Sequence, residues 1–349
     1  MRSTANISWF ADITLADRAR VGGKGGSLGE LTRANIAVPP GFIVTTQGFE
    51  RVLAELEKEN PIRSRVEALS LKDLRGIRLL SEELRRRVKS ATLPEDVCAD
   101  IVAAHKELCG PDLGWPLAVR SSATSEDSEE ASFAGLQDTY LWVKGTEPVL
   151  EYVRSCWASL YSVPSISYRL KDGTPENGVA IAVVVQKMVD ARSAGVMFTR
   201  SPLTGDRSVI TIESAWGLGS AVVSGEVTPD RFVIGKTTGQ ISVRDISDKR
   251  IQDVPAEGGG IKHIAAPEEF RRAPSISDEE LKALAEIGRK VERHYGRPQD
   301  IEWAIDHQGE IILLQSRPET VWSGKDKAPV AQPAENPLLH VMNIFGGRR

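Results

Sequence analysis

The segment at residues 120–140, RSSATSEDSEEASFAGLQDTY, constrains most strongly what this chain can fold into. It opens with an arginine, is rich in Ser, Thr, Gly and Ala, and follows an apolar run at residues 116–119 that predicts a strand. A strand leading into a loop of small residues lets backbone N–H groups and hydroxyls surround phosphate oxygens, because the main chain can approach the anion closely. Arg120 would add a bidentate, permanently charged contact. An ordinary solvated loop has the same composition, so both interpretations stay open for this segment alone.

A second pattern that suits phosphate lies near the N-terminus. Residues 21–29 have the sequence VGGKGGSLG, which indicates a glycine-rich loop around Lys24. A P-loop would need a glycine where Arg18 stands and a Ser or Thr where Gly25 stands. The pattern therefore excludes a nucleotide site of the Walker type.

Two strands and a tight turn are predicted at residues 300–318. Because strand side chains alternate between faces, each strand presents one set of side chains to a common surface. These sets are Asp300, Glu302 and Ala304 on the first strand, and Ile311, Leu313, Gln315 and Arg317 on the second. A turn that pairs Ile305 with Glu310 would place Glu302 near Leu313, and Asp300 near Gln315. Carboxylate and amide oxygens are suited to Mg²⁺, whereas the alternative is an edge hairpin with a solvated charged face.

Helical and strand patterns alternate through the rest of the chain. Apolar residues recur at helical spacing at residues 92–108 and 146–161, and again after a capping box at Ser277 and Glu280. Residues 179–189 form an apolar run that is rich in β-branched residues and typical of a buried strand. Further strands are predicted at residues 209–213, 231–234 and 240–243.

Five ordered motifs together carry a resemblance to a known family. They are GGKG at residues 22–25, the 120–140 block, AGVMFTRSPLTG at 194–205, ESAWGLG with VVSGEVTPDRF at 213–232, and DIEW with QSRP at 300–318. The chain resembles, over residues 21–320, the N-terminal nucleotide-binding domain of phosphoenolpyruvate synthase, pyruvate phosphate dikinase and the rifampicin phosphotransferases. The resemblance implies an α+β ATP-grasp fold with ATP between two lobes. We expect the lobes at residues 1–200 and 201–322, followed by a linker-like tail at 323–349.

The resemblance also implies which residues would bind ATP and Mg²⁺. The family's cationic phosphate ligands, which would also act in catalysis, match Lys24, Arg120 and Arg317. Its metal-binding pair matches Glu302 and Gln315, with Asp300 nearby as a further contributor. The loop that covers the phosphates includes Gly135 and Thr139, and the adenine contact matches Gln186. Most carboxylates of the covering loop must point away from a polyphosphate: Glu126, Asp127, Glu129, Glu130 and Asp138.

Complete members of the family carry a phosphohistidine in a downstream domain, and no such motif occurs in this sequence. The resemblance therefore implies a subunit that binds Mg-ATP and passes the β-phosphoryl group to a histidine on a partner subunit, giving AMP and inorganic phosphate. Single chains of this kind resemble the β subunit of phenylphosphate synthase, whose final acceptor is phenol. A split or shortened phosphoenolpyruvate synthase, with pyruvate as acceptor, is the near alternative. A non-catalytic ATP-binding regulatory subunit is an alternative of another class.

Charge and cysteine content limit the possible partners and location. The net charge is −4 and there is no long basic run, so we expect no nucleic-acid partner. No apolar stretch has the length needed to span a membrane, and the first residues do not open a signal peptide. The widely spaced Cys98, Cys109 and Cys156 suggest free thiols in a reducing cytoplasm.

Overall fold

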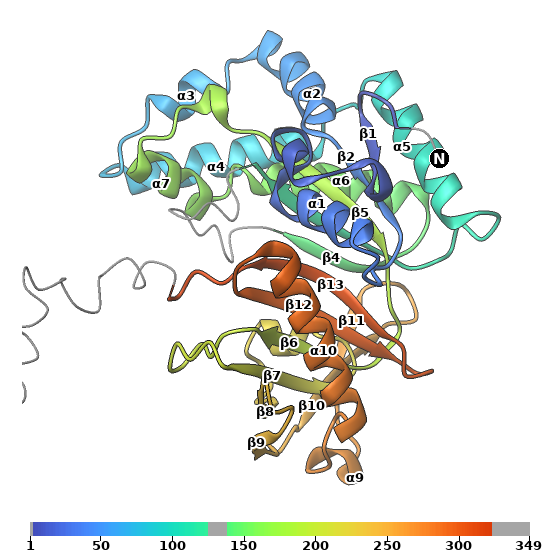
Figure 1. Ribbon diagram of the computed structural model, residues 1–349. Coiled ribbons are helices and arrows are strands. Elements are labelled where there is room, and N and C mark those ends of the chain that lie inside the picture. The colour runs from blue at the N-terminus through green and yellow to red at the C-terminus, as the bar shows by residue number, and fades with distance from the viewer. Residues whose placement is uncertain (1–2, 125–137, 323–349) are drawn as a thin grey trace, which may run out of the picture.

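The computed structural model describes residues 3–124 and 138–322, which form two α+β lobes (Figure 1). The first lobe is built on an antiparallel sheet with the strand order β1-β2-β5-β3-β4. Its strands are β1 (Ile7–Trp9), β2 (Gly41–Val44), β3 (Leu117–Ala123), β4 (Thr139–Val143) and β5 (Ile181–Lys187). Its helices are α1 (Arg18–Arg33), α2 (Thr46–Glu59), α3 (Arg63–Glu67), α4 (Leu74–Lys89), α5 (Glu95–Cys109), α6 (Thr146–Ser159) and α7 (Val163–Asp172), with 3-10 turns η1 (Phe10–Asp12), η2 (Leu15–Asp17) and η3 (Glu176–Gly178).

The second lobe is built on an antiparallel sheet with the strand order β13-β12-β6-β7-β8-β9 and a separate β10–β11 hairpin. Its strands are β6 (Ala191–Phe198), β7 (Val209–Trp216), β8 (Asp230–Gly235), β9 (Ile241–Asp245), β10 (Ile251–Pro255), β11 (Ile261–Ala265), β12 (Gln299–Asp306) and β13 (Ile311–Pro318). Its helices are α8 (Ser220–Val223), α9 (Glu268–Arg271) and α10 (Asp278–Tyr295).

The sheet of the first lobe is covered on both faces. Val183 and Val185 of β5 pack into the large core beneath α2, α4, α5 and α6, whereas Val184 packs with Val21 and Leu28 of α1 on the other face. A strand that is buried on both sides needs apolar residues at every position. This explains why residues 179–185 are all apolar and confirms the predicted buried strand.

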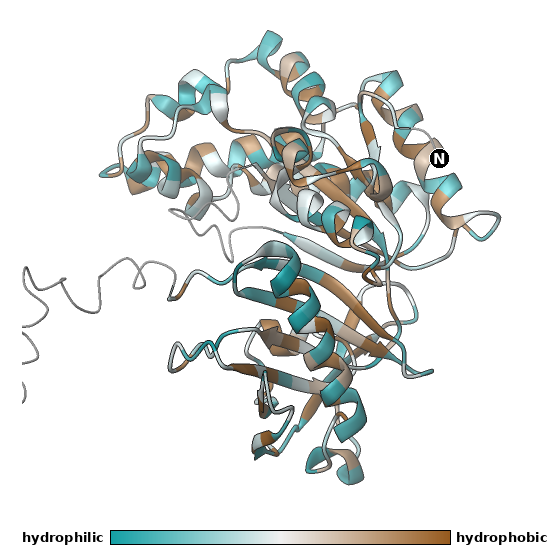
Figure 2. Ribbon diagram, in the orientation of Figure 1, coloured by the Kyte–Doolittle hydropathy of each residue, from teal (hydrophilic) through white to brown (hydrophobic). Residues whose placement is uncertain are grey.

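Helix α10 covers the sheet of the second lobe and follows the prediction closely. Ser277 and Glu280 form the expected capping box, and Gly296 ends the helix in the left-handed region with φ 68°. Leu281, Leu284 and Val291 pack against the sheet as an apolar stripe. Figure 2 shows that the visible face of α10 is mostly hydrophilic, as expected for a helix that covers one side of a sheet.

The change from one sheet to the other occurs between Lys187 and Ala191. Strand β6 pairs with β12 and β7 and belongs to the six-stranded sheet, although it precedes the boundary that we expected between residues 200 and 201. In Figure 1 this strand lies within the lower lobe. Within the described residues, no helix combines the length and the apolarity needed to cross a membrane.

The predicted hairpin at residues 300–318 is present, but its predicted register is wrong. Ile305 pairs with Ile311 rather than with Glu310, and a β-bulge follows between Glu302 and Trp303. Beyond the bulge, Glu302 therefore pairs with Gln315. The extra residue in a bulge breaks the alternation of faces. Leu313 consequently lies in the core of the second lobe, whereas Gln315 lines the cavity described below.

Candidate functional site

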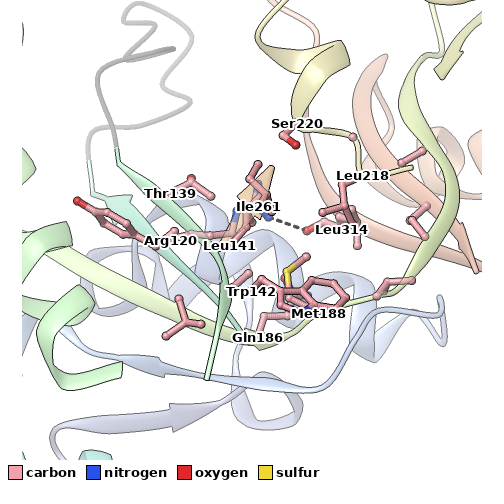
Figure 3. Close-up of a pocket in the computed structure, with 18 of the residues that line it drawn as sticks. Arg120, Thr139, Leu141, Trp142, Gln186, Met188, Leu218, Ser220, Ile261 and Leu314 are labelled. Atoms are coloured by element: carbon pink, nitrogen blue, oxygen red, sulfur yellow. Dashed lines mark hydrogen bonds between the residues drawn. The ribbon is translucent and has the colours of Figure 1, made fainter. Parts of the chain in front are cut away.

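A cavity of about 910 Å³ lies between the lobes and is lined by residues from both (Figure 3). It brings together the predicted site residues that the structure describes: Lys24, Arg120, Thr139, Gln186, Glu302, Gln315 and Arg317. Asp300 is ion-paired with Arg317 beside the cavity. Gly135 and most of the predicted covering loop lie outside the described residues. The cavity size suits a small-molecule ligand.

Arg120 joins the two lobes at one end of the cavity. Its Nη2 donates to Glu302 Oε2 at 2.8 Å and to Gln315 Oε1 at 2.7 Å, and its Nη1 donates to the Leu314 carbonyl at 3.2 Å. The carboxylate and amide oxygens of the predicted metal-binding pair thus converge on a single positive group. Carboxylate and amide oxygens are ligands that Mg²⁺ prefers, so this donor set fits Mg²⁺.

Arg317 is held by the neighbouring carboxylate of Asp300. Its Nε and Nη2 both lie 2.8 Å from Asp300 Oδ2. Burial raises the pKa of the Asp300 carboxyl above its usual value, while the charge of Arg317 acts in the opposite direction. Two contacts to one carboxylate orient the planar guanidinium, and a lysine could not reproduce this orientation.

The prediction of a glycine-rich loop around Lys24 is wrong, because these residues lie within α1. The helix is kinked at Gly22, which has φ 72° and ψ 179°, and Lys24 follows in the first turn after the kink. Ser122 Oγ donates to the Val21 carbonyl at 2.9 Å and accepts from the Gly25 N–H at 3.2 Å. Gly22 therefore allows a close approach of α1 to β3, and Lys24, two residues further along α1, lines the cavity.

The prediction of a hydroxyl-lined loop beginning at Arg120 also needs correction. Strand β3 continues to Ala123, so Ser121 and Ser122 are buried strand residues. Ser121 Oγ donates to the Asp138 carbonyl at 3.1 Å, and Ser122 is bonded to α1. Both hydroxyls therefore donate hydrogen bonds to backbone carbonyls of the protein itself. The strand extends further than composition suggested because β5 pairs with it along its whole length.

Gly22 provides a direct test of this packing, because a side chain there has no room. A Cβ atom at Gly22 would lie 2.2 Å from the Ser122 carbonyl oxygen, in addition to the strain of φ +72°. We expect Gly22→Ala to lower the free energy of unfolding by about 3 kcal/mol, measured by urea denaturation. Gly110→Ala is the matched control, since Gly110 has a similar backbone conformation (φ 65°, ψ −145°) but open space around it. The control should cost about 1 kcal/mol, and equal costs for both variants would contradict the close-packing argument.

Part of the cavity wall is apolar, and the sequence patterns did not reveal it. Its lining comes from both lobes: Trp142, Met188, Val189, Ala191, Ala194, Leu218, Ile261, Ala304 and Leu314. Gln186 also lines the cavity and donates its Nε2 to the Pro39 carbonyl at 3.2 Å. These residues come from separate strands and loops, so no local spacing could have identified them as one group. The cavity therefore suits a ligand with an apolar part and a strongly anionic part.

A second group of possible metal ligands lies on the β10–β11 hairpin and near α8. Ligand atoms of Glu226, Asp253 and His263 lie within 4.8 Å of one another. His263 Nδ1 is 2.5 Å from Asp253 Oδ1, and His263 Nε2 is 3.5 Å from Glu226 Oε2. The imidazole lies between the two carboxylates, and in its protonated form it offsets their charge. We therefore assign no metal to this group.

Two α+β lobes enclose a cavity that is lined by cationic, oxygen-bearing and apolar side chains, as expected for the ATP-grasp fold. The sequence itself matches the family described as "Pyruvate phosphate dikinase, AMP/ATP-binding domain" over residues 18–337. The chain belongs to this family, which confirms the expected family and α+β fold.

Several curated proteins are similar to this chain. It is 44% identical over 317 residues to a probable phosphoenolpyruvate synthase of Methanothermobacter thermautotrophicus, covering 90% of this chain and 46% of the relative. It is 42% identical over 313 residues to a rifampicin phosphotransferase of Streptomyces sp, covering 88% and 35%. It is 37% identical over 371 residues to the phosphoenolpyruvate synthase of Pyrococcus furiosus, covering 94% and 45%. The chain thus spans less than half the length of each of these relatives.

Solved structures align more weakly. The biotin carboxylase domain of the Hydrogenobacter thermophilus 2-oxoglutarate carboxylase, in complex with MgADP, aligns at 10% identity with a TM-score of 0.32, covering 86% of this chain and 40% of that chain. The ATP-grasp ligase PsnB aligns at 10% identity with a TM-score of 0.27, covering 95% and 62%. Because these scores are low, the family assignment rests on the sequence matches.

Proposed function

We propose that this chain binds Mg-ATP and passes the β-phosphoryl group of ATP to a histidine on a partner subunit, releasing AMP and inorganic phosphate. The observation that carries the proposal is the charged end of the cavity. There Lys24, Arg120 and Arg317 line the same space as the oxygen donors of Glu302 and Gln315. Cations of this kind neutralise the charge that a transferring phosphoryl group carries.

Each charged residue has a distinct part in this proposal. Lys24 acts as a mobile point charge, while Arg120 and Arg317 make directed contacts with phosphate oxygens. Glu302 and Gln315 would hold Mg²⁺, which neutralises phosphate charge when it is bound. Arg120 already contacts both of these oxygen donors. A metal ion and Arg120 would therefore be positioned by the same two side chains.

The transfer needs a nucleophile that these residues do not provide. An imidazole nitrogen of the partner attacks the β-phosphorus, the bond to the α-phosphate oxygen breaks, and AMP leaves with the electron pair. Water then releases the γ-phosphate as inorganic phosphate and leaves the phosphorylated histidine. In-line attack depends on how accurately the β-phosphorus is held, so catalysis by this chain consists mainly of positioning and charge neutralisation.

Two final acceptors deserve testing. Phenol is the acceptor that the resemblance to phenylphosphate synthase suggests, and pyruvate is the second candidate. The relatives named phosphoenolpyruvate synthase support pyruvate, because the chain is 44% and 37% identical to two of them. Both acceptors take the phosphoryl group after the histidine, so the role of this chain is the same in each case.

Reconstitution with a partner tests the proposal. Calorimetry on the purified chain should detect Mg-ATP binding, while AMP release should be almost undetectable until a phosphohistidine-domain subunit is added. The same subunit with its histidine replaced by alanine is the control and should restore no AMP release. Rapid AMP release by the chain alone would contradict the partner-dependent mechanism. ATP binding without AMP release, even with the intact partner, would favour a non-catalytic regulatory subunit.

A further inference from the structure

The sheet face that carries Glu302 continues beyond the cavity. Glu302 of β12 pairs with Val196 of β6, and Val196 pairs with Glu213 of β7. Residues that pair directly on neighbouring strands lie on the same face of a sheet, so these three side chains form one row. Met197 and Ile212 point to the other face, where α10 packs. Of the three residues in the row, Glu302 lines the cavity, whereas Val196 and Glu213 lie outside it.

This row is more open to solvent than the row before it. Ala304, Ala194 and Ala215 pair with one another in the same way, and each is at most 2% exposed. Residues of α8 and of the turn before it cover these alanines. Val196 and Glu213, one row further along the strands, are only half-buried. A group from outside the chain can therefore reach Glu213 without entering the cavity.

The Glu213 carboxylate lacks a counter-charge. Arg231 of β8 is its partner in the strand register, but the Arg231 guanidinium donates to Asp245 Oδ2 at 2.7 Å. Among the residues that the structure describes, none forms a hydrogen bond or an ion pair with the Glu213 carboxylate. Burial raises the pKa of the Glu213 carboxyl, the charge of Arg231 opposes this, and the charge of Asp300 raises it further. A half-buried carboxylate without a partner is unfavourable, which points to a ligand that brings a hydrogen-bond donor.

The space above Val196 lies between two carboxylates with different tasks. Glu302 and Glu213 are separated by two strand spacings, about 10 Å between their Cα atoms, and the small side chain of Val196 lies between them. An imidazole over Val196 can therefore turn one ring nitrogen to Glu213 and the other to a phosphate beside Glu302. Carboxylates orient histidine rings in this way, by accepting the N–H of the nitrogen that does not react.

We propose that Glu213 accepts a hydrogen bond from the partner's histidine and positions its ring for attack on the β-phosphorus. This inference rests on the proposed function. One ring nitrogen attacks the β-phosphorus, while the other keeps its proton and donates a hydrogen bond to Glu213. The attack places positive charge on the ring, and the carboxylate stabilises this charge without taking the proton. Glu213 thus positions the nucleophile, whereas Arg120 and Arg317 position the nucleotide.

A glutamine at this position tests the proposal, because it keeps the shape of the side chain but removes the charge. We expect Glu213→Gln to lower the rate of AMP release at saturating phosphohistidine-domain subunit by about tenfold or more. Calorimetry should show unchanged Mg-ATP affinity, because Glu213 lies outside the cavity. The urea midpoint should not fall, because the change removes an unpaired charge. Glu279→Gln is the matched control, since Glu279 is exposed on α10 at the opposite face of the sheet, and all three measurements should stay unchanged.

Titration of the partner subunit separates positioning from simple docking. A rate for Glu213→Gln that recovers fully at saturating partner would show that Glu213 contributes only to docking, and the proposal would be wrong. A parallel loss of Mg-ATP affinity would place Glu213 in the nucleotide site and would also overturn it. If Glu213→Gln does not fold, Glu213→Asp replaces it, and an unchanged rate there would lead to the same rejection, because its carboxylate is drawn back by one methylene. Absence of AMP release by the original chain with the intact partner would instead refute the proposed function.

Discussion

Replacing Glu302 by glutamine should lower partner-dependent AMP formation by about a hundredfold or more, the loss typical for one preorganised charged group at a transition state. The substitution keeps the shape of the side chain and an oxygen that can accept from Arg120, which now donates to Glu302 Oε2 at 2.8 Å. It removes the negative charge that would help to hold Mg²⁺. The measurement is the initial rate of AMP release with the phosphohistidine partner at saturating Mg-ATP.

The stability of the same variant separates chemistry from folding. Glu302 is about one-quarter exposed and keeps its hydrogen-bonding capacity as glutamine, so we expect the free energy of unfolding to change by less than about 2 kcal/mol. Glu310→Gln is the matched control, because Glu310 is exposed at the turn of the same hairpin. The control should form AMP at the original rate. An unchanged rate of AMP formation in Glu302→Gln would contradict the metal-binding role of Glu302. It would favour the alternative interpretation, an edge hairpin with a solvated charged face.

Replacing Arg317 by lysine should reduce β-phosphoryl transfer by about tenfold or more while Mg-ATP still binds, because a small misplacement of the reacting atom is costly. The positive charge is kept, but the planar fork that Asp300 orients is lost. Asp300 Oδ2 lies 2.8 Å from both Nε and Nη2 of Arg317. Calorimetry on Arg317→Lys should therefore still detect Mg-ATP binding, whereas partner-dependent AMP release should fall.

Lys24→Arg serves as the comparison for this charge-conserving change. If Lys24 acts mainly as a point charge, its replacement by another cation should affect transfer less than Arg317→Lys does. Transfer at the original rate in Arg317→Lys would show that Arg317 supplies only general positive charge. The positioning role proposed for its contacts with Asp300 would then be wrong.

Local features were predictable because neighbouring residues encode them. The capping box at Ser277 and Glu280, the stop at Gly296 and the apolar run of β5 each depend on short-range backbone preferences and periodicity. The five ordered motifs together indicated the family, which the match over residues 18–337 confirms. The candidate site residues could therefore be named from the sequence motifs without the structure.

Their arrangement required the tertiary structure. Arg120 and Glu302 are separated by 182 positions in sequence, and their contact depends on how the two lobes meet. The bulge between Glu302 and Trp303 pairs Glu302 with Gln315 instead of Leu313. Strand β6 belongs to the second lobe because it pairs with β12. Trp142 reaches the cavity only because a second bulge, in β4, redirects its side chain. Sequence alone determined the family, the capped helix α10, the buried strand β5 and the candidate ligands, since these follow from short-range patterns. Register, bulges and the meeting of the lobes followed from contacts between distant segments, whose packing no local pattern contains.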